Sequence, residues 1–262
     1  MKHLKKIIFT AVLAAALSTS AFAASGFEFI LNVPLGMGIN LLPQFSYNVR
    51  VPYQSGTSTG IDILSANYNS PNRLGFDTGI SAQIGYMWQV VNNFGISLLG
   101  EVGYSFDSLY GTYKFESADD GAANFLPNDG ISVSTYTHTL KVGLLPKFNI
   151  NAFSIGIGGG VIIPMAASQS ISFNGAKGSF QDTKLINPIG FYGKLTFDYS
   201  IFFTDKIALN IGLYTGVDYI GLVETVIAGN PNDVGGQYFN TPFLTYDIGL
   251  QVGFRFGPKA FN

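Results

Sequence analysis

The sequence predicts an all-β fold, a transmembrane antiparallel up-and-down β-barrel of eight strands. Three observations predict it: long segments alternate between apolar and polar residues, the connections between these segments alternate between short and long, and charged residues make up only 11% of the chain. An ordinary soluble domain has about 25% charged residues. A chain this poor in charge has little with which to hydrate an outer surface.

Composition excludes several other classes of protein. Aromatic residues make up 15% of the chain, which argues against intrinsic disorder. There are no cysteines, so disulfides, thiolate metal sites and cysteine nucleophiles are excluded. The formal net charge is −2 and no basic block occurs, so no nucleic-acid partner is expected.

The first 23 residues have the pattern of a secretory signal peptide. Three lysines stand within the first six residues, an apolar stretch covers 7–17, and small residues lead to an Ala-x-Ala site that ends at Ala23. This order is typical of a cleaved leader. We expect cleavage between Ala23 and Ala24, which leaves 24–262 as the barrel. An N-terminal membrane anchor is the alternative, although the apolar run is short for a membrane-spanning helix.

Eight segments alternate with the period of two that is typical of strands. They cover 27–39, 73–90, 94–107, 132–148, 152–165, 188–203, 206–222 and 242–257. In chain order their apolar faces run from Phe29 to Leu35, Phe76 to Trp88, Phe94 to Phe106, Leu140 to Phe148, Phe153 to Ile163, Phe191 to Tyr199, Leu209 to Tyr219 and Leu244 to Phe256. Each segment therefore has one face suited to an apolar solvent.

The connections favour a barrel that crosses an outer membrane. Tight turns are expected at 91–93, 149–151 and 204–205, and long polar connections at 40–72, 108–131, 166–187 and 223–241. This rhythm is typical of outer-membrane barrels. A sheet in lipid must close because every backbone amide needs an internal partner. Aromatic residues gather near both ends of the segments, as at two membrane interfaces. A soluble lipocalin-like barrel is the alternative.

The first long connection leaves the strand count open between eight and ten. Its residues alternate from Phe45 to Tyr53, so it could add a strand pair to the barrel. Pro43, Pro52 and Pro71 favour an extracellular hairpin, because proline is excluded from inner positions of a sheet.

With these features the chain resembles the small bacterial outer-membrane β-barrel superfamily, which includes the membrane domain of outer-membrane protein A, outer-membrane proteins X and W, and opacity-type adhesins. Phe254 and Phe256 match the alternating aromatic end of the family's last strand, while Gln251 replaces an expected glycine and 257–262 runs beyond that end. The resemblance implies the outer membrane of a diderm bacterium, with outer-membrane lipid and the barrel-assembly machinery as partners. We also expect a monomer and no cofactor.

The polar faces carry nearly all the charged residues of the eight segments. These predicted lumen charges are Glu28, Asp77, Glu101, Asp107, Lys141, Lys147, Lys194, Asp198, Asp218, Asp247 and Arg255. Isolated buried charges are costly, so we expect the acids and bases to pair across a narrow interior. A plugged lumen is thus the favoured hypothesis, since eight strands leave room for little more than side chains. An ion path is the alternative.

Inward apolar residues keep a second function open. Ile30, Leu99 and Leu145 belong to the otherwise polar faces. In the simpler interpretation, these side chains fill gaps inside the barrel. Barrels similar to outer-membrane protein W, however, have a partly apolar lumen. A narrow channel for small or hydrophobic solutes is therefore the alternative function.

No catalytic or metal-binding constellation is found. His138 is the only histidine after the predicted cleavage. The histidine pattern of lipid A deacylase barrels resembles His-x-Ser, and Leu140 stands at the serine position. We therefore expect a non-enzyme without a metal site, and a solvated His138 near a membrane interface.

The long connections are the expected location of function. Binding residues concentrate on loops carried by rigid scaffolds. Tyr47, Arg50, Tyr53 and Tyr68 are the candidate contact residues, because Tyr and Arg are favoured anchors at interfaces. The sequence thus predicts a surface protein with a structural, adhesive or antigenic role towards host or extracellular ligands.

Overall fold

The computed structural model describes residues 25–41, 44–55, 58–118, 131–173, 176–180, 183–185, 189–228 and 237–260. The predicted signal peptide at 1–23 and its cleavage site at Ala23 and Ala24 lie outside these residues and remain predictions. In the described part of the chain, no helix is long and apolar enough to cross a membrane.

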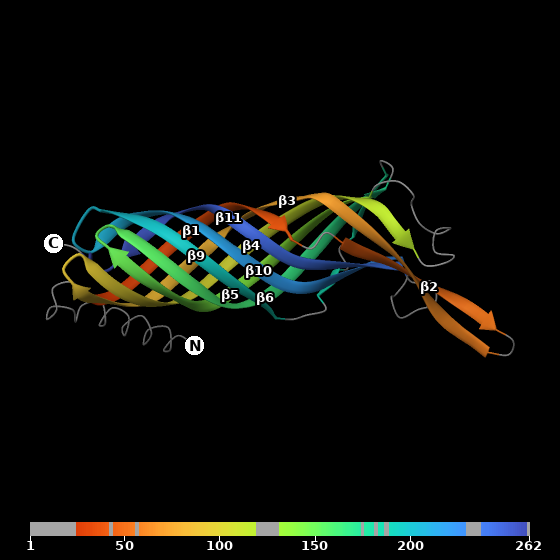
Figure 1. Cartoon of the computed structure of the whole chain (residues 1–262), viewed down its shortest axis with the longest axis horizontal. Helices are drawn as coiled ribbons and strands as arrows, with labels where there is room; N and C mark the ends of the chain where they lie inside the picture. Colours follow the sequence, from red (N-terminus) through yellow and green to blue (C-terminus); the bar gives the residue numbers. More distant parts are fainter. Residues whose placement is uncertain are drawn as a thin grey trace, which may run out of the picture.

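Eight strands form a closed antiparallel ring, which confirms the predicted fold class (Figure 1). In ring order they are β1 (Gly26–Asn40), β3 (Ser58–Val91), β4 (Phe94–Ala118), β5 (Ile131–Ile150), β6 (Phe153–Phe173), β9 (Gly190–Phe202), β10 (Ile207–Ala228) and β11 (Gln237–Phe256). β1 pairs with both β3 and β11, from Gly26 opposite Met87 and from Phe29 opposite Phe256. This double pairing closes the barrel.

Tight turns join the strands at one end of the barrel, the short-turn end, as predicted. Val91 pairs with Phe94, and Ile150 pairs with Phe153, so each of these hairpins has a two-residue turn. Asn93 has φ 69° and Asn151 has φ 53°. This left-handed region is unfavourable for most L-residues, and asparagine is among the few that tolerate it. The asparagines therefore suit these positions.

The hairpin interpretation of the first long connection is confirmed, and the ten-strand alternative is wrong. β2 (Gln44–Ser55) pairs with the first part of β3, from Gln44 opposite Asn69 to Ser55 opposite Ser58. Its pairing with β11 covers only 46–49, whereas β1 closes the ring beside β11 over twelve residue pairs. The hairpin therefore projects beyond the barrel (Figure 1).

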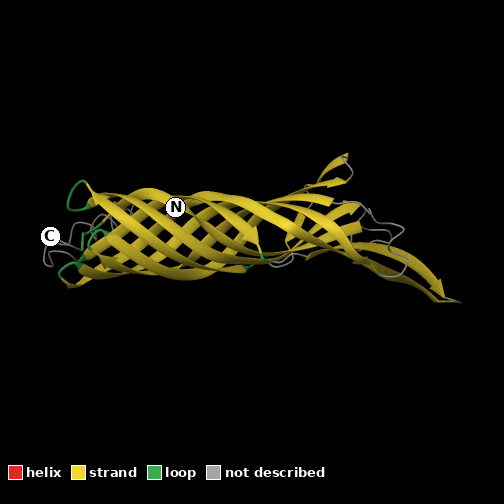
Figure 2. Cartoon of the chain, turned by 45° about the horizontal axis from the view of Figure 1, so that its top comes forward, coloured by secondary structure: helices red, strands yellow, loops and turns green. Residues whose placement is uncertain are grey.

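The other long connections contain more strand than the sequence predicts. β4 continues to Ala118, β6 to Phe173 and β10 to Ala228, and the short strands β7 (Ala176–Phe180) and β8 (Thr183–Leu185) pair with β6 and β10. Backbone pairing needs no apolar face, so the sheet continues where the apolar alternation stops. This polar extension comprises 44–55, 58–73, 111–118, 131–135, 166–173, 176–180, 183–185, 220–228 and 237–243, and it lies at the end of the barrel opposite the short turns (Figure 2).

Candidate functional site

The outer face of the ring is apolar over most of the barrel's length. Among the described residues, no Asp, Glu, Lys or Arg occupies an outward position in 27–39, 74–90, 94–110, 136–150, 153–165, 191–201, 207–219 or 244–256. Large apolar side chains are exposed there: Leu144 is 60% exposed and Phe153 is 61% exposed. Soluble monomers rarely expose apolar patches beyond a few hundred Å², so this continuous belt calls for an apolar solvent.

Aromatic side chains lie at both edges of this belt. Near the short turns, the rings of Phe153 and Tyr199 are 4.7 Å apart between centroids. At the other edge, a hydrogen bond of 2.6 Å joins the Tyr104 hydroxyl and Nδ1 of His138. His138 therefore faces outward among aromatic rings, away from the lumen.

All eleven predicted lumen charges belong to inward-facing positions, and each of the four bases has an acidic partner. Nε of Arg255 lies 2.9 Å from Oε1 of Glu28, and Nζ of Lys147 lies 2.8 Å from Oδ2 of Asp198. The other two pairs are Lys194 with Glu101 and Lys141 with Asp218. Each of the four ion pairs joins side chains from two different strands.

The lowest layer of the lumen, at the short-turn end, is built around Glu28. Besides Arg255, this carboxylate accepts a hydrogen bond of 2.5 Å from Oγ of Ser97. Asn149 donates to the same serine oxygen at 2.8 Å, and Arg255 donates to Ser200 at 3.3 Å. Each side chain comes from a different strand, so the network ties the base of the ring together.

The segment after β11 folds back against the short-turn end, a feature that the sequence did not predict. Arg255 donates to the carbonyl of Pro258 at 3.4 Å, and Gln89 donates to the carbonyl of Ala260 at 3.3 Å. The side chain of Lys259 lies 2.7 Å from the Asp205 carboxylate, and this hydrogen bond and charge lower the pKa of Asp205. Ala260 is 1% exposed, so the segment lies against the lowest layer.

The next layers combine an apolar cluster with a second buried ion pair. Ile30, Leu99 and Leu145 pack together inside the barrel and are almost fully buried. Asp198, the partner of Lys147, also accepts a hydrogen bond of 2.5 Å from Nε2 of Gln251. The Gln251 amide thus gives the buried Asp198 carboxylate a further hydrogen-bond donor besides Lys147.

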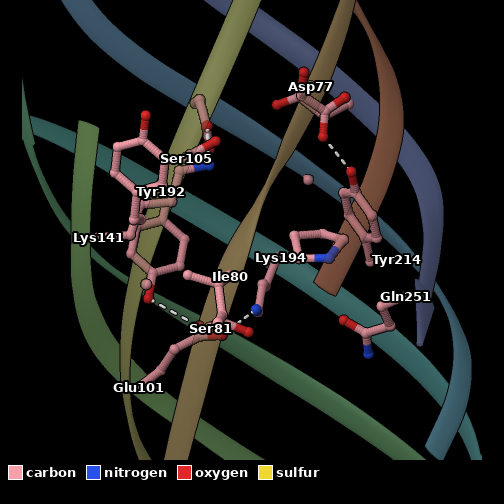
Figure 3. Close-up of a pocket in the computed structure, with 16 residues that line it drawn as sticks. Asp77, Ile80, Ser81, Glu101, Ser105, Lys141, Tyr192, Lys194, Tyr214 and Gln251 are labelled. Carbon is pink, nitrogen blue, oxygen red and sulfur yellow. Dashed lines mark hydrogen bonds and ion pairs between the residues drawn. The ribbon is translucent and has the colours of Figure 1, made fainter. Parts of the chain in front are cut away.

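Farther from the short turns, two tyrosines cross the lumen (Figure 3). Tyr192 donates to Oε2 of Glu101 at 3.0 Å, and Tyr214 donates to Oδ2 of Asp77. Gly36 on β1 provides the space for this second contact, because a Cβ there would collide with the Tyr214 hydroxyl. A cavity of about 60 Å³ lies between these groups, lined among others by Asp77, Glu101, Lys141, Lys194, Asp218 and Asp247.

One predicted contact residue is corrected by the structure. Tyr68 is fully buried, because its strand lies between β2 and β4 in the polar extension. Its ring meets that of Phe115 edge-on, with 5.8 Å between the ring centroids. It offers no exposed contact surface. Tyr47, Arg50 and Tyr53 lie on the β2 hairpin, and their side chains lie outside the described part of the structure.

No family model matches this chain, and no curated protein matches it. Solved structures do resemble it. Neisserial surface protein A is 14% identical with a TM-score of 0.33, covering 89% of this chain and 98% of its own. The outer membrane protein OprG from Pseudomonas aeruginosa is 14% identical with a TM-score of 0.36, covering 88% and 97%. The toluene transporter TbuX from Ralstonia pickettii is 7% identical with a TM-score of 0.36, covering 94% and 93%. The fold class of this chain rests on its own strand pairing.

Proposed function

We propose that this chain is an integral outer-membrane β-barrel protein. The observation that carries the proposal is the outward belt, which is apolar on every ring strand, free of Asp, Glu, Lys and Arg over the ranges given above, and edged by aromatic residues. A closed ring satisfies its backbone amides internally, as lipid requires. The short-turn end would then face the periplasm and the polar extension the exterior.

Extraction and gel migration test the membrane assignment. Envelopes of cells that express the chain should retain it through carbonate washing and release it in detergent. The folded barrel should migrate differently from the boiled sample on a gel. Recovery of folded protein in buffer without detergent would contradict the proposal and favour the soluble barrel.

We propose further that the lumen does not conduct and that the protein has no catalytic role. Four ion pairs, an apolar cluster and the segment 257–260 fill successive layers, which supports a closed lumen. Planar-bilayer recording should give only rare, small conductances. Stable large openings, or uptake of small apolar solutes into proteoliposomes, would favour the channel alternative.

We assign the biological role to the polar extension, as a structural, adhesive or antigenic surface. The β2 hairpin supports this, because it projects from the end of the ring that is opposite the short turns (Figure 1). Ring pairing between β1 and β3 ends at Leu74, so a deletion of 44–68 leaves the ring complete. Cells expressing the deletion variant should keep a heat-modifiable barrel and lose binding to host matrix. Unchanged binding would exclude the hairpin as the contact surface.

A further inference from the structure

The lumen has more acids than bases, and the excess is concentrated in one place. After the four ion pairs, Asp77, Asp107 and Asp247 form no ion pair of their own among the described side chains, and the charge of one shared base, Lys141, acts on all three. Asp77 and Asp107 stand directly opposite each other in the β3–β4 ladder. Like charges in such a position repel each other, and Asp77 is only 7% exposed. The pair therefore favours more positive charge than Lys141, which Asp218 already holds, supplies.

Two carboxylate oxygens of this pair are also without a hydrogen-bond donor. Oδ1 of Asp77 and Oδ2 of Asp107 are both buried and have no partner in the structure. Tyr214 donates to the other oxygen of Asp77, and Ser105 donates to the other oxygen of Asp107 at 2.9 Å. A buried acceptor left unsatisfied is costly. Oδ1 of Asp77 can therefore accept a contact from a further ligand.

Asp77 and Asp247 line the same cavity, and each lies opposite an inward glycine of β1 in the sheet. A Cβ at Gly36 would lie 2.7 Å from Oδ1 of Asp77, and one at Gly38 would lie 2.5 Å from Oδ1 of Asp247. The two carboxylates therefore occupy the room that the missing side chains leave. The cavity that both Asp77 and Asp247 line measures about 60 Å³, enough for more than one water-sized particle.

The charges that line this cavity do not balance. Its carboxylates are Asp77, Glu101, Asp218 and Asp247, and its only bases in the described structure are Lys141 and Lys194. Both lysines are already held, by Asp218 and Glu101 respectively. The lining thus has two more acidic than basic side chains, so a mobile cation is attracted to it.

The form of the site limits the ion that it can hold. Within the described residues, no group of three or more His, Cys, Asp or Glu side chains is placed to hold a metal ion. Divalent ions prefer several such ligands. We propose that the upper lumen binds a small monovalent inorganic cation, such as Na⁺, K⁺ or ammonium, with Asp77 as its principal ligand and Asp247 as the second carboxylate. The site depends neither on the adhesive role nor on the membrane.

Sodium NMR tests the site directly. The full protein, folded in zwitterionic micelles, is titrated with NaCl against choline chloride at constant ionic strength, and the ²³Na transverse relaxation is measured. We expect excess relaxation for the wild type, removed by competing KCl or ammonium chloride. Asp77→Asn and Asp247→Asn should each weaken Na⁺ binding by roughly tenfold or more, as loss of a charge-assisted contact predicts.

The control is Asp205→Asn, an exposed acid at the short-turn end, which should leave the relaxation unchanged. Heat-modified gel migration shows that each variant is folded, and if Asp77→Asn does not fold, Asp247→Asn alone provides the test. Equal ²³Na relaxation for the wild type and the folded lumen variants would overturn the proposal. That result would assign the compensating charge to a proton shared by the acids.

Discussion

At the scale of single residues, the pair of Arg255 and Glu28 should dominate the stability of the lowest layer. Both side chains are almost fully buried, at 2% and 0% exposure. Arg255→Met removes the positive charge and leaves the buried Glu28 carboxylate without its ion-pair partner. We therefore expect a loss of about 3–5 kcal/mol in the free energy of unfolding. Urea unfolding in micelles measures it, and adding Glu28→Gln should recover part of the loss.

Lys259→Met is the matched control, because its partner Asp205 is 84% exposed. It should leave the urea midpoint unchanged. If Arg255→Met behaved like this control, the lowest layer would be open to water and the proposal of a closed lumen would lose its main support.

The sequence could predict which way charged residues face, but not which acid meets which base. Strict alternation places Lys141 and Asp218 on inward faces, yet they are 77 residues apart and come from β5 and β10. Their meeting depends on the stagger of the strands around the ring, which alternation does not encode. For the same reason, the hydrogen bond from the Gln251 amide to Asp198 could not be predicted from the sequence.

At the scale of the elements, the tight turns depend on residues that accept a left-handed backbone. Asn93→Val places a β-branched residue at φ 69° and should cost about 1–2 kcal/mol, while Asn93→Gly should be close to neutral. Asn92→Val is the matched control, since Asn92 occupies the same turn without a positive φ. Urea midpoints of the three variants measure this, and equal loss in both valine variants would contradict the explanation.

The ends of the strands were the least predictable feature of the elements. The short turns were located correctly because polar residues, among them Asn92, Asn151 and Asp205, interrupt the apolar alternation abruptly. At the other end, the second strand of the predicted hairpin continues into the predicted segment that begins at 73, so that β3 covers Ser58–Val91. Asn69, Ser70 and Pro71 suggest a break between the two, although the backbone pairing with β4 continues past them after a register shift.

At the scale of the whole molecule, the proposal that lipid surrounds the apolar belt can be tested by placing one arginine at either of two depths in the belt. Val33 and Ile39 both face outward on β1, at 44% and 42% exposure, near the middle and near the end of the belt. In lipid, Val33→Arg should cost about 2–4 kcal/mol and Ile39→Arg about 0–1 kcal/mol, because the cost of a charge depends on its depth. In water, both would be ordinary surface substitutions within about 0.5 kcal/mol.

Equilibrium urea unfolding in phospholipid vesicles measures both variants against the wild type. Because the two side chains are almost equally exposed, packing losses should be similar, and the difference between the variants reports the surrounding solvent. A larger loss for Val33→Arg than for Ile39→Arg supports a belt centred in the bilayer. Equal small losses would mean that water surrounds the belt, and the membrane assignment would then fail even though the eight-stranded ring is correct.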